Sequence, residues 1–176
     1  MTIESHKFQT VTKEKRAIVT AATSGIGWAT ALALAKDGAQ VCIGAPSKDI
    51  EAAAPQLQEC REQDLSIKAI AYDAFDTDSY QNLFHTALAE MGGLDILVNN
   101  FGYTNPKIDL DIFHINYQDY DRIVRVNLAS VIIPTQMALP LMAQQGGGSI
   151  VNIASIAGKV PDVTEMAYGT AKSAIC

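Results

Sequence analysis

Two side chains near the end of the sequence are spaced for acid–base chemistry. Tyr168 and Lys172 are four residues apart in the stretch 165–175, whose pattern predicts a helix. Residues i and i+4 lie on one helix face, so the phenol and the ammonium are expected side by side. A nearby cation favours the phenolate and lowers a phenol pKa from its usual value of about 10. The alternative is an exposed helical pair without a chemical role.

A hydroxyl group is expected close to this pair. Ser155 ends the apolar pattern at residues 149–155, which predicts a strand. The carboxyl edge of an open α/β sheet is where ligands bind, and a hydroxyl there could hold a substrate oxygen beside the phenol. The sequence has no GxSxG motif, so we do not expect Ser155 to be a hydrolase nucleophile.

The elements that must position these residues alternate along the chain. Strand patterns occupy residues 16–22, 39–44, 66–74, 94–100 and 149–155. Helix patterns lie between them, at 28–37, 48–63, a stretch ending at Met91, and 118–145, where Pro134 and Pro140 should bend or interrupt the helix. We expect Asp76 or Thr77 to cap the third of these helices. This alternation predicts an α/β fold, a Rossmann-type doubly wound parallel sheet, in one dinucleotide-binding domain spanning residues 1–176.

A glycine-rich turn joins the first strand to the first helix. The turn reads TAATSGIG and contains the candidate binding residues Thr20, Ser24, Gly25, Ile26 and Gly27. Its glycines let the backbone approach a pyrophosphate and let the helix pack closely on the strand, and free N–H groups at the helix start attract negative charge. A purely structural turn is the alternative.

The end of the second strand bears on the choice of cofactor. The sequence continues into Ser47 and Lys48, and Asp49 is expected inside the next helix, so no acid is suitably placed for a ribose diol. Ser47 and Lys48 could receive a 2′-phosphate, which favours NADP over NAD. Alternatively, Ser47 caps the helix and Lys48 is solvated.

Taken together, TAATSGIG, NNFG, Asn127, Ser155 and YGTAK resemble the short-chain dehydrogenase/reductase family over residues 16–176. The turn departs from the family at Ala21, where members usually have glycine. The resemblance implies that Tyr168 exchanges the proton, that Lys172 lowers its pKa and binds the nicotinamide ribose, and that Ser155 orients the substrate. It implies that the backbone carbonyl of Asn127 supports the proton relay, although a buried amide at a kink would fit equally. It also implies a cofactor wall made by Asp73, Ala74, Asn100 and Gly102.

The resemblance further implies an NAD(P)-dependent oxidoreductase that interconverts a secondary alcohol and a ketone. The stretches VNNFGYTNPKIDL and VPDVTEMAYGTAKSAI are most similar to the bacterial family members that act on the 7-hydroxyl of bile acids. Five apolar residues would suit a flat steroid, or would be ordinary packing around the rim of the site. They are Phe101, Val160, Pro161, Val163 and Met166. The alternatives are a reductase of 3-oxoacyl thioesters or other carbonyls, and a non-catalytic nucleotide-binding or inactive fragment.

The sequence departs from the family at its end. Family members continue beyond the position of Cys176 with further strands and a substrate lid, so the sheet is expected to be incomplete at its C-terminal edge. We therefore expect the 176-residue chain alone to be weakly stable and inactive. In full-length form the resemblance implies a homo-oligomer.

Composition and charge narrow the classes of partner. The net charge of −6 and a pI near 4.9 argue against nucleic acid and anionic membranes. The N-terminal residues lack an apolar leader, and three unevenly spaced cysteines indicate a reducing compartment, so a cytoplasmic protein acting on a small molecule is expected. Polar residues and prolines within 126–143 indicate a core helix, not a membrane span. The three histidines lack metal-ligand spacing, and we predict no metal site.

Overall fold

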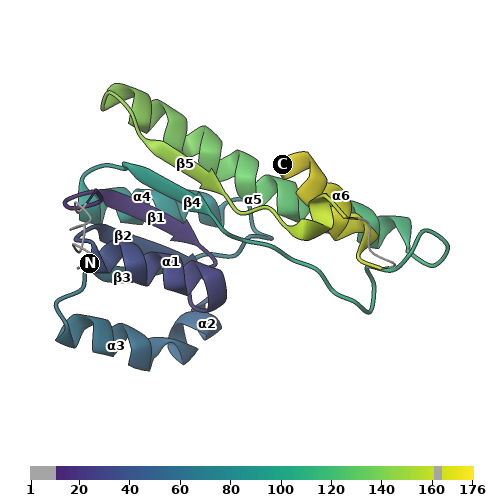
Figure 1. Cartoon of the computed structure of the whole chain (residues 1–176), viewed down its shortest axis with the longest axis horizontal. Helices are drawn as coiled ribbons and strands as arrows, with labels where there is room; N and C mark the ends of the chain where they lie inside the picture. Colours follow the sequence, from purple (N-terminus) through teal and green to yellow (C-terminus); the bar gives the residue numbers. More distant parts are fainter. Residues whose placement is uncertain (1–10, 161–163) are drawn as a thin grey trace, which may run out of the picture.

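The computed structural model describes residues 11–160 and 164–176; residues 1–10, and Pro161 and Val163 of the predicted rim, lie outside this description. It confirms the predicted doubly wound fold (Figure 1). Five parallel strands form one sheet in the order β3-β2-β1-β4-β5. The strands are β1 (Arg16–Thr20), β2 (Gln40–Ala45), β3 (Ile67–Ala71), β4 (Ile96–Asn99) and β5 (Ser149–Asn152). The order reverses between β1 and β4, and at such a switch point α/β sheets bind ligands.

Helices cover both faces of the sheet. They are α1 (Gly25–Lys36), α2 (Ser47–Ala52), α3 (Ala54–Glu62), α4 (Ser79–Met91), α5 (Tyr117–Gln144) and α6 (Met166–Ile175), with the short 3-10 helix η1 (Ile156–Gly158) after β5. Ala17 and Val19 of β1 pack in the core that includes α1 and α3, whereas Ile18 packs in the core of α4 and α5. Both faces of the central strands are therefore buried, as their unbroken apolar sequences predict.

Two helix starts differ from the predictions. The helix predicted over residues 48–63 is two helices, α2 and α3, because Pro55 lies in the first turn of α3 and has no N–H to continue the ladder. Pro46 precedes α2, so Ser47 is its first residue and not its cap. Likewise, Asp78 precedes α4, where Asp76 or Thr77 was expected as the cap.

The long helix α5 runs without interruption through Pro134 and Pro140. Among the described residues it is the one helix long and apolar enough to cross a membrane. However, it packs on the sheet through Val126, Ala138 and Met142, which are buried in the core with β4. This packing is that of a core helix, as predicted.

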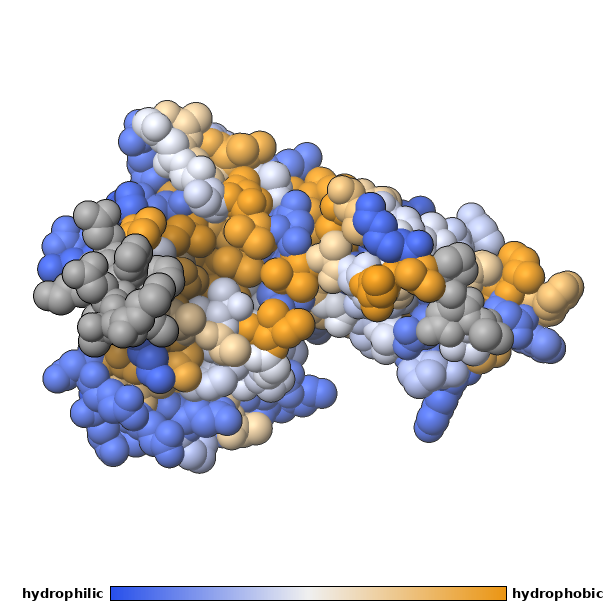
Figure 2. Space-filling model, viewed as in Figure 1, coloured by the Kyte–Doolittle hydropathy of each residue, from blue (hydrophilic) through white to orange (hydrophobic). Residues whose placement is uncertain are grey.

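The strand β5 forms one edge of the sheet. Within the described residues it pairs only with β4, and Val151 is 46% exposed. Figure 2 shows apolar side chains gathered over β5 and the adjoining part of α5, whereas α3 presents a mostly hydrophilic surface. The described sheet is thus open at the edge where the sequence predicted it to be incomplete.

Candidate active site

A cavity of about 210 Å³ opens where β1, β2, β3 and β4 end. It is lined by Ala21, Thr23 and Ser24 of the glycine-rich turn, by Ala45, Pro46 and Asp49, by Tyr72, Asp73, Ala74 and Phe75, and by Phe101 and Gly102. These residues come from four separate segments that meet at the switch point of the sheet. The predicted binding residues Ser24, Asp73, Ala74 and Gly102 are therefore brought together.

Asn100 fastens the two central strand ends to each other. Its side-chain amide donates to the backbone oxygens of Thr20 (3.1 Å) and Ala21 (2.9 Å). Its backbone N–H donates to the Thr20 hydroxyl at 3.0 Å. Thr20 is fully buried, so the two predicted cofactor residues hold the wall of the cavity instead of facing into it.

The glycine-rich turn has the local geometry of a phosphate-binding loop. Gly25 has a φ of +53° and no atom within 4 Å of the point where a Cβ would stand, so its backbone faces open space. A Cβ on Gly27 would lie 2.5 Å from Asn100 Nδ2 and 2.6 Å from Ala21 O, so only glycine allows α1 to pack this closely. Ile26, between them, is 64% exposed. Open backbone at the start of α1 fits a bound pyrophosphate.

Ala21 departs from the family pattern and has a strained backbone. Its φ is +51°, in the left-handed region where a side chain is unfavourable by about 1 kcal/mol. The chain therefore keeps the conformation that a glycine would adopt freely. The departure of Ala21 from the family's glycine therefore alters the turn only slightly.

The end of β2 corrects one prediction about charge. Asp49 lies in the first turn of α2 and lines the cavity, although no acid was expected there. Ser47 and Lys48 are exposed and are not among the residues lining the cavity. Asp49, and neither Ser47 nor Lys48, therefore lines this end of the cavity.

Aromatic side chains form the opposite wall. Phe75 and Phe101 both line the cavity, and their rings meet edge to face with centroids 6.3 Å apart. Tyr103 packs on Phe75 in the same way at 4.9 Å, and the Arg122 guanidinium lies 5.1 Å from the Phe75 centroid. Phe101 was predicted as part of an apolar rim, but its contact with Phe75 was not predicted.

Tyr168 and Lys172 lie together beside this cavity. Lys172 Nζ is 5.6 Å from the centre of the Tyr168 ring. A Cβ on Gly102 would stand 3.3 Å from Lys172 Nζ and 3.5 Å from the Tyr168 hydroxyl. Because Gly102 also lines the cavity, the predicted acid–base pair adjoins the predicted nucleotide site.

Lys172 is buried and joins three segments. It is 1% exposed, and its ammonium donates to the backbone oxygens of Ile153 (2.9 Å) and Phe101 (3.3 Å). Burial lowers the pKa of Lys172 below its ordinary value, because removal from water disfavours the charged form. The two carbonyl groups stabilise the ammonium and fix it between the ends of β4 and β5.

Ser155 follows β5 and begins η1. Its hydroxyl oxygen accepts the N–H of Ala157 at 3.2 Å, which leaves the hydroxyl proton free to be donated. The short helix η1 is packed tightly on α6, since a Cβ on Gly158 would lie 2.7 Å from the backbone of Lys172. The segment that carries Ser155 is thereby fixed to the helix that carries Tyr168.

Asn127 is a buried residue of α5 whose side chain binds backbone. Its amide oxygen accepts the N–H of Tyr103 (3.0 Å), and its amide nitrogen donates to the oxygens of Tyr103 and Ile123 (both 2.8 Å). Its own carbonyl oxygen accepts the Ser130 hydroxyl. Within the described residues no hydrogen bond joins Asn127 to Lys172. The side chain anchors the start of the loop that follows Gly102.

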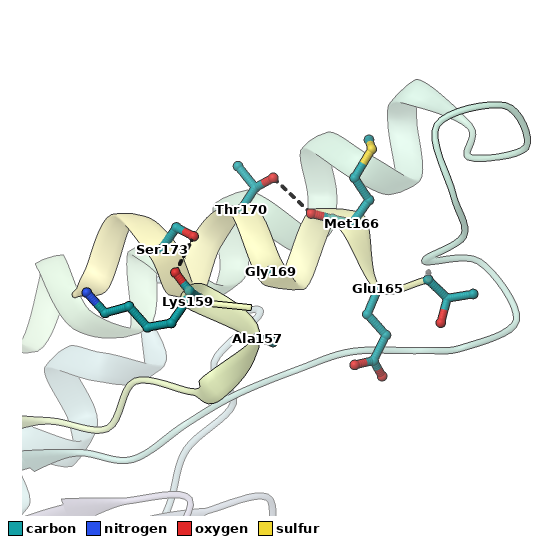
Figure 3. A pocket seen from close by; sticks show the side chains of 9 residues that line it. Ala157, Lys159, Glu165, Met166, Gly169, Thr170 and Ser173 are labelled. Carbon is teal, nitrogen blue, oxygen red and sulfur yellow. Dashed lines mark hydrogen bonds between the residues drawn. The ribbon is translucent and has the colours of Figure 1, made fainter. Parts of the chain in front are cut away.

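A second hollow, of about 250 Å³, lies against α6 (Figure 3). Met166, Gly169, Thr170 and Ser173 line it from one face of the helix, and Ser173 donates to the oxygen of Gly158 at 2.7 Å. The helical period places this face opposite Tyr168 and Lys172. This hollow is therefore separate from the acid–base pair.

One residue of the site was missed by sequence reasoning. Asp109 is fully buried, and its carboxylate accepts the N–H groups of Ala167 (2.8 Å) and Tyr168 (3.0 Å). It lies in the loop between β4 and α5. An acid in a polar loop carries no signal of such a contact, because its partners are 58 and 59 residues away.

Known proteins that are similar to this chain in sequence include a dehydrogenase and a reductase. The chain is 39% identical over 161 residues to the 7alpha-hydroxysteroid dehydrogenase of Clostridium sardiniense, a match that covers 92% of this chain and 61% of the relative. It is 32% identical to the 3-oxoacyl-(acyl-carrier-protein) reductase FabG of Thermotoga maritima, covering 92% and 63%. The chain thus spans less than two thirds of the length of these relatives.

The fold and the family agree with this result. The crystal structure of a short-chain type dehydrogenase/reductase from Mycobacterium marinum superposes with a TM-score of 0.84 at 29% identity, covering 95% of this chain and 67% of that one. The family model described as short chain dehydrogenase matches residues 15–176. The chain therefore belongs to the short-chain dehydrogenase family.

Proposed function

We propose that this chain forms the nucleotide-binding and proton-transfer part of an NAD(P)-dependent oxidoreductase that interconverts a secondary alcohol and a ketone. One observation carries the proposal. Gly102 lines the cavity at the switch point, and a Cβ on it would stand within 3.5 Å of both the Tyr168 hydroxyl and Lys172 Nζ. An acid–base pair beside the cavity at the switch point of the sheet is the arrangement that alcohol oxidation by a dinucleotide needs.

The residues of the chain have distinct roles in the proposed reaction. The bound dinucleotide supplies a hydride to the ketone carbon, or accepts one from the alcohol. In the reductive direction the Tyr168 hydroxyl gives its proton to the substrate oxygen. The Lys172 ammonium stabilises the resulting phenolate at short range, because little water screens a buried charge. The Ser155 hydroxyl donates a hydrogen bond to the same oxygen and keeps its proton. Asn127 supports the relay through its backbone carbonyl.

For the cofactor we propose NADP. The support is the exposed pair Ser47 and Lys48 at the start of α2, whose hydroxyl and ammonium suit a 2′-phosphate. Asp49, which lines the cavity, is the opposing feature because a carboxylate suits the free ribose of NAD. Thr20, Gly25, Ile26, Gly27 and Asn100 shape the phosphate end, and Asp73 and Ala74 form the adenine end.

For the substrate we propose a hydroxysteroid, the 7-hydroxyl of a bile acid. Two observations support this choice. The chain is 39% identical in sequence to a 7alpha-hydroxysteroid dehydrogenase, and the apolar side chain of Val160 is 55% exposed. A 3-oxoacyl thioester is the second candidate, supported by the similarity to the acyl-carrier-protein reductase. Rates on a 7-oxo bile acid and on an acyl thioester distinguish the two.

The proposed setting is the cytoplasm, with a homo-oligomer as the assembled form. The cysteines support a reducing compartment, since Cys42 and Cys60 are buried free thiols. Burial raises the pKa of Cys42 to about 11, which makes this thiol unreactive.

The test separates binding from chemistry. NADPH binding to the 176-residue chain is followed by the fluorescence of Trp28, which lies next to Gly27 in α1. Turnover is measured with NADPH and a 7-oxo bile acid on the chain extended beyond Cys176 by the C-terminal segment of the Clostridium sardiniense relative, because the 176-residue chain alone is expected to be inactive. We expect Tyr168→Phe to leave binding unchanged and to lower turnover by about a thousandfold or more. Tyr117→Phe, at an exposed tyrosine at the start of α5, is the matched control and keeps turnover. Binding without any turnover would favour the non-catalytic alternative, and an active Tyr168→Phe would contradict the assigned role.

A further inference from the structure

The helix that carries Tyr168 has no cap of its own. Glu165 occupies the N-cap position of α6 with a φ of 59°, in the left-handed region, and its side chain makes no capping hydrogen bond. The first N–H groups of a helix need acceptors when they are buried. In α6 these acceptors come from elsewhere in the chain.

Asp109 provides them from the loop between β4 and α5. Its Oδ1 accepts the N–H of Ala167 at 2.8 Å and its Oδ2 accepts the N–H of Tyr168 at 3.0 Å. Its backbone oxygen accepts the N–H of Glu165 at 2.9 Å. The hydroxyl of Thr104 lies 3.4 Å from the carboxylate of Asp109 and 3.3 Å from that of Glu165. One residue thus binds the last residue before α6 and the first turn of the helix.

The Asp109 carboxylate and the start of α6 stabilise each other electrostatically. Asp109 is 0% exposed, and no Lys or Arg forms a salt bridge with it among residues 11–160 and 164–176. A buried carboxylate without a cation is costly unless N–H groups and a helix N-terminus stabilise it. The loop therefore keeps its position only when α6 begins at Met166, and α6 begins there because the carboxylate is present.

The same loop starts at the cavity. Gly102 lines the cavity, and Tyr103, the next residue, is held by the side chain of Asn127 through two hydrogen bonds. From there the chain reaches Asp109, which binds the backbone of Tyr168. Residues 103–109 are thus a strap, fixed at one end beside Gly102 and at the other end to Tyr168 itself.

We propose that Asp109 is a positioning residue for Tyr168, which sets the place of the phenol relative to Gly102 and Lys172. The effect on catalysis rests on the proposed function, whereas the effect on α6 does not. Because the carboxylate contacts the N–H of Tyr168 directly, a shift of the strap moves the phenol. Displacements of about 1 Å at a reacting group cost about a hundredfold in rate.

The experiment compares Asp109→Asn with Asp111→Asn in the 176-residue chain. Asp111 is the matched control because it lies in the same loop, is half-buried and, within the described residues, has a carboxylate that accepts hydrogen bonds only from its near neighbours Phe113 and His114. Hydrogen exchange is measured at the amides of Ala167 and Tyr168. In Asp109→Asn we expect these amides to exchange about tenfold faster, beyond any change at β1 and β4, because the carboxamide leaves one N–H without an acceptor. Asp109→Glu, which keeps the charge, should restore most of the protection. Asp109→Ser, which keeps a short acceptor without the charge, replaces Asp109→Asn if that variant does not fold, and faster exchange at the same two amides is again expected.

Turnover of the chain extended by the relative's C-terminal segment gives the second readout. Asp109→Asn should lower kcat about tenfold or more while the NADPH Kd and the substrate KM stay within about twofold. In a Tyr168→Phe background the same change should have no further effect on the residual rate, because Asp109 acts through Tyr168. Equal exchange in the Asp109→Asn and Asp111→Asn chains would overturn the proposal. Faster exchange without NADPH binding by the unaltered chain would instead contradict the proposed function and leave the hold of Asp109 on α6 established.

Discussion

The ammonium of Lys172 lies 5.6 Å from the centre of the Tyr168 ring, and both side chains come within 3.5 Å of the point where a Cβ on Gly102 would stand. The proximity follows from a local spacing of four residues on a helix. The place of the pair at the end of the nucleotide cavity does not follow from local spacing. It depends on β4 and β5, whose carbonyl oxygens at Phe101 and Ile153 hold the Lys172 ammonium.

Substitution of Gly102 tests this arrangement without unfolding the chain. A Cβ there would stand 3.3 Å from Lys172 Nζ, so the end of a flexible side chain must move by a few tenths of an ångström. We expect Gly102→Ala to change the free energy of unfolding by less than about 1 kcal/mol and to lower turnover by about tenfold. Denaturant unfolding and steady-state kinetics measure the two effects. Unchanged turnover would show that the space over Gly102 is not used.

Replacement of Ala21 by glycine should stabilise the chain. Ala21 has a φ of +51°, which costs about 1 kcal/mol for a residue with a side chain, and glycine relieves this strain at a smaller entropic cost. We expect Ala21→Gly to raise the free energy of unfolding by about 0.5 kcal/mol. The control is the same chemical change at Ala29, an exposed residue of α1, where it should destabilise by about 1 kcal/mol. Destabilisation by both changes would contradict the strained turn.

The strands and the acid–base pair could be predicted because they depend on local sequence. Apolar runs bounded by glycine identify β1 and β4, and the spacing of Tyr168 and Lys172 identifies their shared face. The role of Asp109 could not be predicted, since its partners in α6 are brought to it only by the tertiary fold. Pro55 was a local indication that the predicted helix divides into α2 and α3. The apolar periodicity of residues 48–63 nevertheless favoured a single helix. Asp49 was correctly predicted to lie inside the helix after β2, but its place in the lining of the cavity was not predicted, because it depends on how α2 sits at the end of the sheet.

The ion pair between Arg16 and Asp95 gives a pH-dependent contribution to the free energy of unfolding. Arg16 hydrogen-bonds Asp95 through Nε at 2.7 Å and through its backbone N–H at 3.0 Å. The side-chain bond from Arg16 holds the pKa of Asp95 below its ordinary value. A carboxylate with a lowered folded pKa stabilises the fold above its unfolded pKa of about 3.9, and this stability is lost as the pH falls through the folded value.

We therefore expect Asp95→Asn to lower the free energy of unfolding by about 2 kcal/mol at neutral pH. The difference from the unaltered chain should shrink as the pH falls below about 4, where the carboxyl of the unaltered chain also becomes neutral. Denaturant unfolding at a series of pH values measures it. A difference that stays constant into acid would show that the charge of Asp95 contributes nothing.

Cofactor preference can be tested at the start of α2. If NADP is the cofactor, Lys48→Ala should raise the Kd of NADPH by about five- to tenfold and leave that of NADH unchanged, because one exposed charge pair is worth about 1 kcal/mol. Asp49→Asn removes a negative charge from the cavity and should tighten NADPH in particular. Tighter binding of NADH by the unaltered chain would assign the site to NAD, with Asp49 as the residue at the ribose.

The central claim is that the cavity at the ends of β1 to β4 binds a dinucleotide beside Tyr168, and NADPH titration followed by Trp28 fluorescence tests it most directly. The account predicts a saturable change that Tyr168→Phe retains. Ser24→Glu should weaken binding by about tenfold or more, since its carboxylate repels the pyrophosphate while the same charge favours the N-terminus of α1. No saturable change, or equal binding by the Ser24→Glu chain, would contradict the account.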